Sequence, residues 1–301
     1  MAVKLGVRVQ PKGGPVAPQV RPEPNASPQE LSAPRVVLLI HGFNNSEERA
    51  ERSYRAVEAR LRSQLRGYGT GRLGAIWQFY WPGDQIGPLP VLGQIRGYRE
   101  SLDNALETGR LLAAFLAGHR HQQICVIGHS MGCRVTLEML RSIDKSPSLR
   151  RWSGGNTAVL LAAAVPEAMC REPSGSYLHT HSEWSERVIW SRNDRILHYL
   201  FPLGQPREPF EGGPAVGYTG GPTGRWSGSS SLPLYRTRAD PLRLGHSQYW
   251  GSKEVARRIA TLLGLLKVRF LPAAEIPATT LDEEGLEDRP LIRRELPSRT
   301  E

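Results

Sequence analysis

The pentapeptide Gly128-His129-Ser130-Met131-Gly132 is the part of the sequence most directly suited to chemistry. It fits the pattern Gly-x-Ser-x-Gly, which places a serine on a sharp turn between a strand and a helix. The glycines let the strand and the helix approach closely, while the turn holds the serine hydroxyl clear of the backbone. We therefore predict that Ser130 is a nucleophile for acyl chemistry.

His246 and Asp194 are the residues that could activate this serine. A serine hydroxyl needs a histidine to remove its proton, and the histidine needs a carboxylate to fix its tautomer. In sites of this kind the chain order is serine, acid, histidine. His246 stands in LRLGHSQYW before the last predicted helix, and Asp194 follows the apolar strand RVIWSR. Asp240 stays an alternative acid, although it precedes Pro241 and is more typical of a turn.

Two backbone amides are predicted to stabilise the negative charge that develops on the substrate oxygen. Met131 begins the helix after the predicted nucleophile, where helix amides favour an anion. Phe43 follows the buried strand of VVLLIHGFNNS, whose His-Gly pair permits a turn toward the same place. Each such donor is worth about 3 kcal/mol. Asn44 and Asn45 are expected only to stabilise that turn through side-chain to backbone bonds.

Alternating strands and helices are needed to bring these distant residues together. Strands are predicted at 35–43, 74–81, 123–128, 157–165 and 187–192, and helices at 47–66, 98–117, 132–143 and 252–266. The helix at 98–117 carries an apolar stripe from Leu102 to Leu116, as a helix covering a sheet should. This order predicts an α/β fold with a mostly parallel central sheet and helices on both faces.

Both ends of the chain are expected to be flexible tails around a single domain. Residues 1–34 are rich in Pro and Gly and residues 272–301 carry mixed charge, so neither segment is expected to pack. The folded domain is predicted over 35–271. Within it, the Gly-, Pro- and Ser-rich stretch 204–231 is expected to be a long loop at the rim of the site.

Composition narrows the classes of function. The net charge of +10 comes mostly from Arg residues that are spread through Glu-rich helices, so no nucleic-acid partner is expected. No apolar run reaches the ~18 residues of a membrane span and no secretory signal stands out, which predicts a cytoplasmic protein without stable membrane insertion. The three cysteines indicate buried thiols. His179 and His181 lack a third ligand at a typical spacing, so neither a metal nor a cofactor is expected.

A series of motifs resembles a known protein family. In chain order they are IHGFNN, FYWPGD, YRESLDNALETGRLLAAFL, IGHSMGCRVTLEML, VIWSRNDRIL and GHSQYW. With these motifs the chain from about 35 to 266 resembles the α/β-hydrolases and, within them, the bacterial family DUF900, whose function is unknown. The resemblance implies a serine-hydrolase triad without naming a substrate.

The residues and the resemblance together predict a serine hydrolase of small carboxylic esters that works through an acyl-enzyme. Trp81, Phe201 and Tyr249 are expected to line its pocket. Two alternatives stay open: acyl transfer to an acceptor other than water with the same residues, and a non-catalytic protein of this fold that binds a partner. The sequence leaves the oligomeric state open.

Overall fold

The structure is a computed structural model of the chain. It describes residues 2–9, 14–66, 69–84, 90–119, 121–146, 155–170, 184–205, 213–220 and 244–266. These residues belong to one compact unit, Met1–Lys267.

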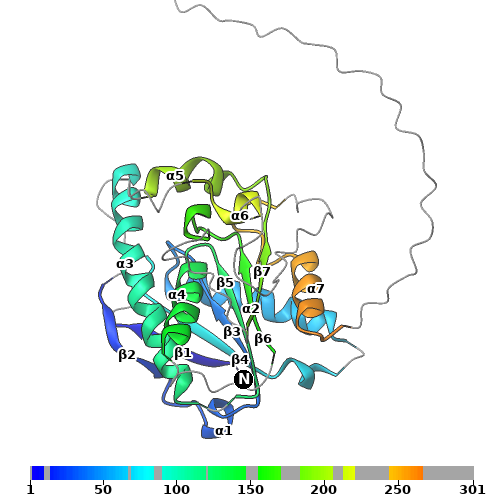
Figure 1. The fold of residues 1–301 in the computed structure, drawn as a ribbon. Coiled ribbons are helices and arrows are strands. Elements are labelled where there is room, and N and C mark those ends of the chain that lie inside the picture. The colour runs from blue at the N-terminus through cyan, green and yellow to red at the C-terminus, as the bar shows by residue number, and fades with distance from the viewer. Residues whose placement is uncertain are drawn as a thin grey trace, which may run out of the picture. The chain divides into compact units, whose positions relative to one another are not determined.

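A seven-stranded sheet lies at the centre of this unit, with the strand order β2-β1-β4-β3-β5-β6-β7 (Figure 1). Its strands are β1 (Val3–Arg8), β2 (Val16–Pro22), β3 (Arg35–Ile40), β4 (Ala75–Tyr80), β5 (Gln123–His129), β6 (Asn156–Leu161) and β7 (Trp184–Ile189). Neighbouring strands are parallel except β1 and β2, which are antiparallel. The predicted fold class, α/β with a mostly parallel sheet, is confirmed.

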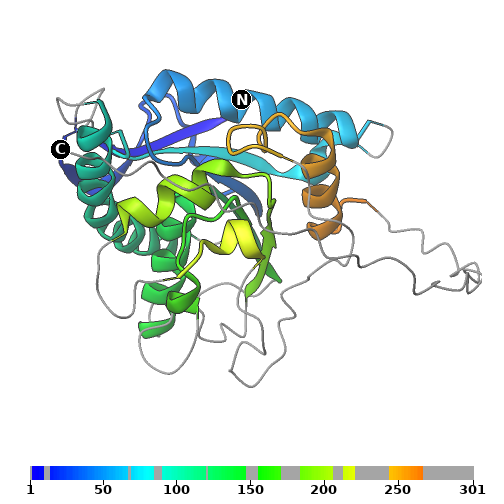
Figure 2. The same ribbon diagram turned by 90° about the horizontal axis from the view of Figure 1, so that it is seen from above.

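Helices cover both faces of the sheet (Figure 2). The longer ones are α2 (Glu47–Gln64), α3 (Pro90–Ala117), α4 (Gly132–Lys145) and α7 (Lys253–Leu262), and the short elements are α1 (Pro28–Leu31), η1 (Thr70–Leu73), η3 (Glu167–Cys170), η4 (Ile196–Leu200), α5 (Phe201–Gly204) and α6 (Val216–Thr219). One core cluster joins one face of the sheet to α3 and α4, and a second joins the opposite face to α2 and α7. Because both faces are covered, the central strands are apolar at nearly every position.

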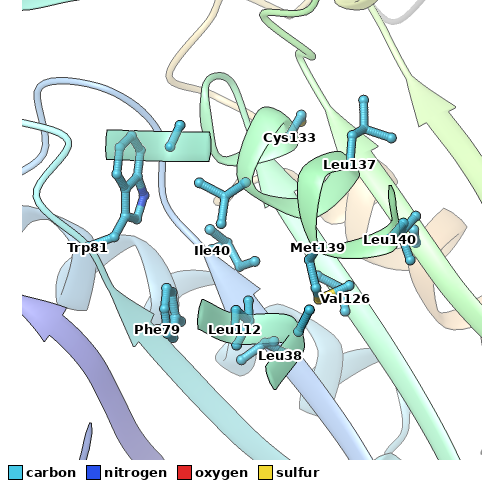
Figure 3. Close-up of a cluster of buried hydrophobic side chains, with 14 of the residues drawn as sticks. Leu38, Ile40, Phe79, Trp81, Leu112, Val126, Cys133, Leu137, Met139 and Leu140 are labelled. Atoms are coloured by element: carbon cyan, nitrogen blue, oxygen red, sulfur yellow. The ribbon is translucent and has the colours of Figure 1, made fainter. Parts of the chain in front are cut away.

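The core between the sheet and the α3–α4 layer is shown in Figure 3. Leu38, Phe79 and Val126 come from three neighbouring strands and are fully buried. Leu112 of α3 and Met139 of α4 belong to the same cluster and are also fully buried. Full burial of a side chain of this size stabilises the fold by about 1.5–3 kcal/mol. This packing fixes the frame from which the loops at the carboxyl ends of the strands project.

The prediction that residues 1–34 form a flexible tail is wrong. This segment supplies β1, β2 and α1, and β1 pairs in parallel with β4 through the residue pairs Val3–Trp77 and Leu5–Phe79. The physical reason is the period-2 pattern of β1, which buries alternate residues against the core. Two of the prolines that suggested disorder, Pro18 and Pro22, lie in β2, where an edge strand tolerates them.

The predicted domain limits change accordingly. The compact unit spans Met1–Lys267 rather than 35–271, and the predicted tail 272–301 lies outside the described residues. The stretch 204–231 is described only in part, and that part is not all loop, because α6 lies within it. The N–H of Val216 in α6 donates to the carbonyl of Val165, which packs α6 beside the chain that leaves β6.

The cysteines and the helices bear on two further expectations. Cys125, Cys133 and Cys170 are all buried and free, as the sequence predicted. Burial raises the pKa of all three thiols, so they stay protonated at neutral pH. Among the helices that the structure describes, none is both long and apolar enough to cross a bilayer.

Leu5→Ala tests whether the N-terminal strand belongs to the fold. Leu5 is 1% exposed, so the truncation should lower the free energy of unfolding by about 2–5 kcal/mol in urea titrations. Val9→Ala is the matched control, because Val9 is 57% exposed and its loss should change stability by less than about 0.5 kcal/mol. Equal stability of the two variants would mean that β1 is not part of the core.

Candidate active site

Ser130 occupies the sharp turn between β5 and α4. Its φ of 54° lies in the left-handed region, which is costly for a residue other than glycine. The neighbouring glycines make the turn possible, since a Cβ on Gly128 would lie 2.6 Å from Thr136 Oγ1 and one on Gly132 would lie 2.6 Å from the Ile40 carbonyl oxygen. The structure therefore forms the predicted strand-turn-helix at this serine.

A line of hydrogen bonds connects the three side chains that the sequence singled out. The Ser130 hydroxyl lies 2.9 Å from His246 Nε2, and His246 Nδ1 lies 2.8 Å from Asp194 Oδ2. Asp194 is fully buried, and the His246 side chain is 18% exposed. A carboxylate only accepts, so Nδ1–H donates to Asp194 and Nε2 is left to accept from the serine hydroxyl. This arrangement suits proton removal from Ser130.

Asp194 is held in place by the chain around it. It follows β7, and its Oδ1 accepts the N–H of Leu197 at 3.0 Å, so it also has the turn-stabilising role that is common for Asp. Ser191 links this turn to the histidine segment, because its hydroxyl oxygen accepts the N–H groups of Asn193 at 3.1 Å and Leu244 at 3.0 Å. The sequence analysis did not predict a role for Ser191. The only indication in the sequence is that a polar residue follows an apolar strand. Asp240, the alternative acid, lies outside the described residues.

His129, the residue before Ser130, holds the histidine segment against the turn. Its Nε2 lies 2.8 Å from the carbonyl oxygen of His246, and the two rings are 5.0 Å apart. Burial, with the neighbouring His246 adding to it, lowers the pKa of His129 to about 3, so its ring is neutral at physiological pH. A carbonyl only accepts, so Nε2 carries the proton and donates it. The sequence placed His129 in the turn without indicating this contact.

His41 fixes the loop that carries Phe43. Burial lowers the pKa of His41 to about 3, and nearby Arg8 acts in the same direction, so this ring is also neutral. Its Nε2 accepts the backbone N–H of Trp81 at 3.3 Å. The ring proton therefore lies on Nδ1, which is 2.9 Å from the Gly42 carbonyl oxygen. The loop is therefore tied to the chain after β4.

Asn45 and Arg8 support the same loop from the other side. The Asn45 side-chain amide donates to the carbonyls of Gly42 at 3.2 Å and Phe43 at 3.1 Å, which confirms the expectation that it stabilises the turn. The Arg8 guanidinium reaches the Asn45 carbonyl at 2.9 Å and Asp84 Oδ1 at 3.0 Å, in a nearly buried pair. The N-terminal strand thus braces the loop of Phe43, a link that the tail interpretation missed.

The amides of Phe43 and Met131 are the two predicted oxyanion donors. Neither amide donates a hydrogen bond to any residue that the structure describes. The loop of Phe43 touches the serine turn, since a Cβ on Gly42 would lie 2.7 Å from the Ser130 Cβ. Met131 immediately precedes α4, and no side chain caps that helix. Both amides therefore lie close to the serine and keep their donor capacity.

A cavity of about 340 Å³ opens beside Ser130 and His246. Phe201 lines it, as the sequence predicted. Trp81 and Tyr249 do not, and the expectation for them is wrong. Trp81 is buried, with its ring stacked on His41 and its Nε1–H donating to the His41 carbonyl at 2.8 Å. Tyr249 is buried in the core on the α2–α7 side of the sheet.

The sheet and the serine turn define an α/β-hydrolase. The family model for "alpha/beta hydrolase of unknown function" (DUF900) matches residues 26–200, which is more than half of the chain. The chain belongs to this family. The match includes the serine turn and Asp194, whereas β1, β2 and the GHSQYW motif with His246 lie outside it. No curated protein matches the chain.

His129→Gln tests the buried neutral imidazole through the pH dependence of stability. The folded-state pKa of His129 is about 3, below the ~6.5 of an unfolded chain. Between these values only the unfolded state binds the proton, so wild-type stability falls as the pH drops from about 6.5 toward about 3.

The glutamine variant lacks this proton uptake. In urea titrations between about pH 7.5 and pH 4.5, its stability should fall less steeply than that of the wild type, by up to ~1.4 kcal/mol per pH unit. If stability fell equally steeply with pH in the two proteins, the assignment of His129 as a buried neutral imidazole would be wrong.

Proposed function

We propose that the protein is a serine hydrolase of carboxylic esters. The observation that carries the proposal is the hydrogen-bonded line from Ser130 through His246 to the buried Asp194, with distances of 2.9 and 2.8 Å. Its geometry matches the roles of nucleophile, general base and orienting acid in acyl transfer.

The first half of the reaction forms an acyl-enzyme. Ser130 Oγ attacks the ester carbonyl carbon while its proton passes to His246 Nε2, and the carbonyl π electrons move to the oxygen. When this intermediate collapses, the bond to the alcohol oxygen breaks and His246 gives its proton to the leaving alcohol. Asp194 keeps Nδ1 protonated and stabilises the imidazolium.

The second half repeats these transfers with water. His246 removes a proton from a water molecule, which attacks the acyl carbon, and Ser130 leaves with that proton restored to its oxygen. The acid product and the free enzyme result. Side chains and amides of the chain itself carry the proton transfers and stabilise the charge in these steps, and the reactants are a small-molecule ester and water.

The developing oxyanion is assigned to the amides of Phe43 and Met131. The support is that these N–H groups beside the serine turn donate to none of the residues that the structure describes, together with the positive end of the α4 dipole. Donors fixed before the reaction do not have to reorganise as charge develops, and each is worth about 3 kcal/mol.

The strain at Ser130 favours an enzyme over a binding protein of the same fold. A left-handed φ at a non-glycine residue costs about 1–3 kcal/mol and persists where the surroundings enforce it. A purely binding protein gains nothing from a strained serine aligned with a histidine and a buried carboxylate. A nucleophile gains a hydroxyl that lines the cavity and is aligned with His246.

Ser130→Ala should lower kcat for p-nitrophenyl butyrate by about three to six orders of magnitude. Labelling by a fluorophosphonate probe should disappear as well, while the thermal midpoint stays close to that of the wild type. Ser63→Ala is the control, because this exposed serine of α2 is not among the described residues that line the cavity and should keep both labelling and turnover. Turnover above about a tenth of wild type in Ser130→Ala would contradict the proposal.

Asp194→Asn should lower activity by up to about four orders of magnitude near neutral pH. The amide keeps the shape of the carboxylate, yet it does not hold Nδ1–H as a carboxylate does, so the histidine takes the wrong tautomer. Asp240→Asn should be close to silent. The opposite ranking in kinetics from about pH 6 to pH 9 would move the acid to Asp240 and leave the hydrolase proposal standing.

A further inference from the structure

The cavity beside Ser130 has one predominantly apolar wall. This wall is the helical segment formed by η4 and α5, with Ile196, Leu197, Leu200, Phe201 and Leu203 lining the cavity. Ile196, Leu200 and Leu203 are 42%, 51% and 57% exposed, so this one segment groups several uncovered apolar side chains, as ligand-binding grooves do. A bound apolar group in the cavity would cover part of their surface.

The wall is anchored at both ends. Near its start, the N–H of Leu197 donates to Asp194 Oδ1 at 3.0 Å. At its end, buried Gln205 accepts from Arg134 Nη2 at 2.5 Å and donates to the Tyr98 hydroxyl at 3.0 Å. Tyr98 also packs edge-on against Phe43 with ring centroids 5.4 Å apart. The cavity is therefore built before a ligand arrives, as small-molecule sites usually are.

The described lining of the cavity carries no Asp, Glu, Lys or Arg side chain. Its titratable side chains are His129, His246 and Tyr98, and the first of these is neutral. The whole chain has a net charge of +10, which attracts anions over a distance. A carboxylate that entered the cavity would nevertheless lose its hydration without meeting a fixed cation among the described lining residues, which is costly.

We infer that the cavity binds the acyl group of the ester, and that the preferred acyl group is an uncharged hydrocarbon chain lying along Leu200 and Leu203. This inference rests on the proposed function, because the chain must extend from the carbonyl that Ser130 attacks. It names a substrate class, esters of apolar carboxylic acids, and assigns the specificity to η4 and α5.

A series of p-nitrophenyl esters tests this class on the full chain. From acetate through butyrate and hexanoate to octanoate, kcat/KM should rise by up to about fourfold for each added methylene until the cavity is filled. The hemisuccinate ester should be used at least about tenfold less well than the neutral valerate ester, because its buried carboxylate finds no cation.

Leu200→Ser and Leu203→Ser locate the chain on the wall. Each should lower kcat/KM for octanoate by about tenfold and leave the acetate value within about twofold. Both residues are more than half exposed, so the replacements leave the core intact. Tyr199→Ser is the matched control, because Tyr199 is 63% exposed on the same segment and is not among the described residues that line the cavity. It should leave both values unchanged.

The outcomes separate this inference from the proposed function. If the wild type hydrolyses no ester, acetate included, the proposed function fails and the inference fails with it. If acetate is hydrolysed but the series is flat or falling, or hemisuccinate is preferred, only the acyl-chain assignment is overturned. Equal effects of Tyr199→Ser and Leu200→Ser would likewise remove the chain from this wall.

Discussion

The buried carboxylate of Asp194 is the group on which the site depends. A fully buried carboxylate must receive hydrogen bonds, and it takes one from the Leu197 N–H and one from His246 Nδ1. The first bond fixes the start of the apolar wall of the cavity, and the second fixes the tautomer of the histidine that faces Ser130. The same carboxylate also acts on Tyr249: burial of the Tyr249 phenol raises its pKa, and the nearby Asp194 charge raises it further. One buried charge thus aligns the reacting groups and positions the wall beside them.

Two neutral histidines, His41 and His129, hold the loops that meet at this point. Burial lowers the pKa of each ring to about 3, so each ring is neutral and donates from a single nitrogen. His129 donates a hydrogen bond to the backbone carbonyl of His246, and His41 links the loop of Phe43 to the chain after β4. Such bonds rigidify loops that backbone pairing within the sheet cannot reach. The frame beneath them is the sheet with its two helical layers, extended by β1 and its Arg8.

The sequence predicted well whatever depends on local pattern. Apolar runs and helical stripes placed the strands from β3 onward and the long helices α2, α3, α4 and α7, but not the short elements between them, and the glycines around Ser130 marked the turn. The structure then brings together Ser130, Asp194 and His246, which the sequence had selected by chain order. The sequence-based prediction failed where composition and the hydrophobic pattern disagreed. The prolines before residue 34 indicated disorder, and they outweighed the alternation of Val3, Leu5 and Val7 that is typical of a strand. The prediction also missed Ser191 and His129, whose partners Leu244 and His246 are distant along the chain, because no periodicity reports such contacts.

The central claim is that Ser130 becomes acylated during turnover. Mixing the protein with excess p-nitrophenyl butyrate, quenching with acid within the first turnover and measuring the intact mass tests it most directly. A mass increase equal to one butyryl group, mapped by peptide mass spectrometry to the segment that contains Ser130, is the predicted result. Release of p-nitrophenol by the folded protein with no adduct at any time, or with an adduct on another residue, would contradict the account.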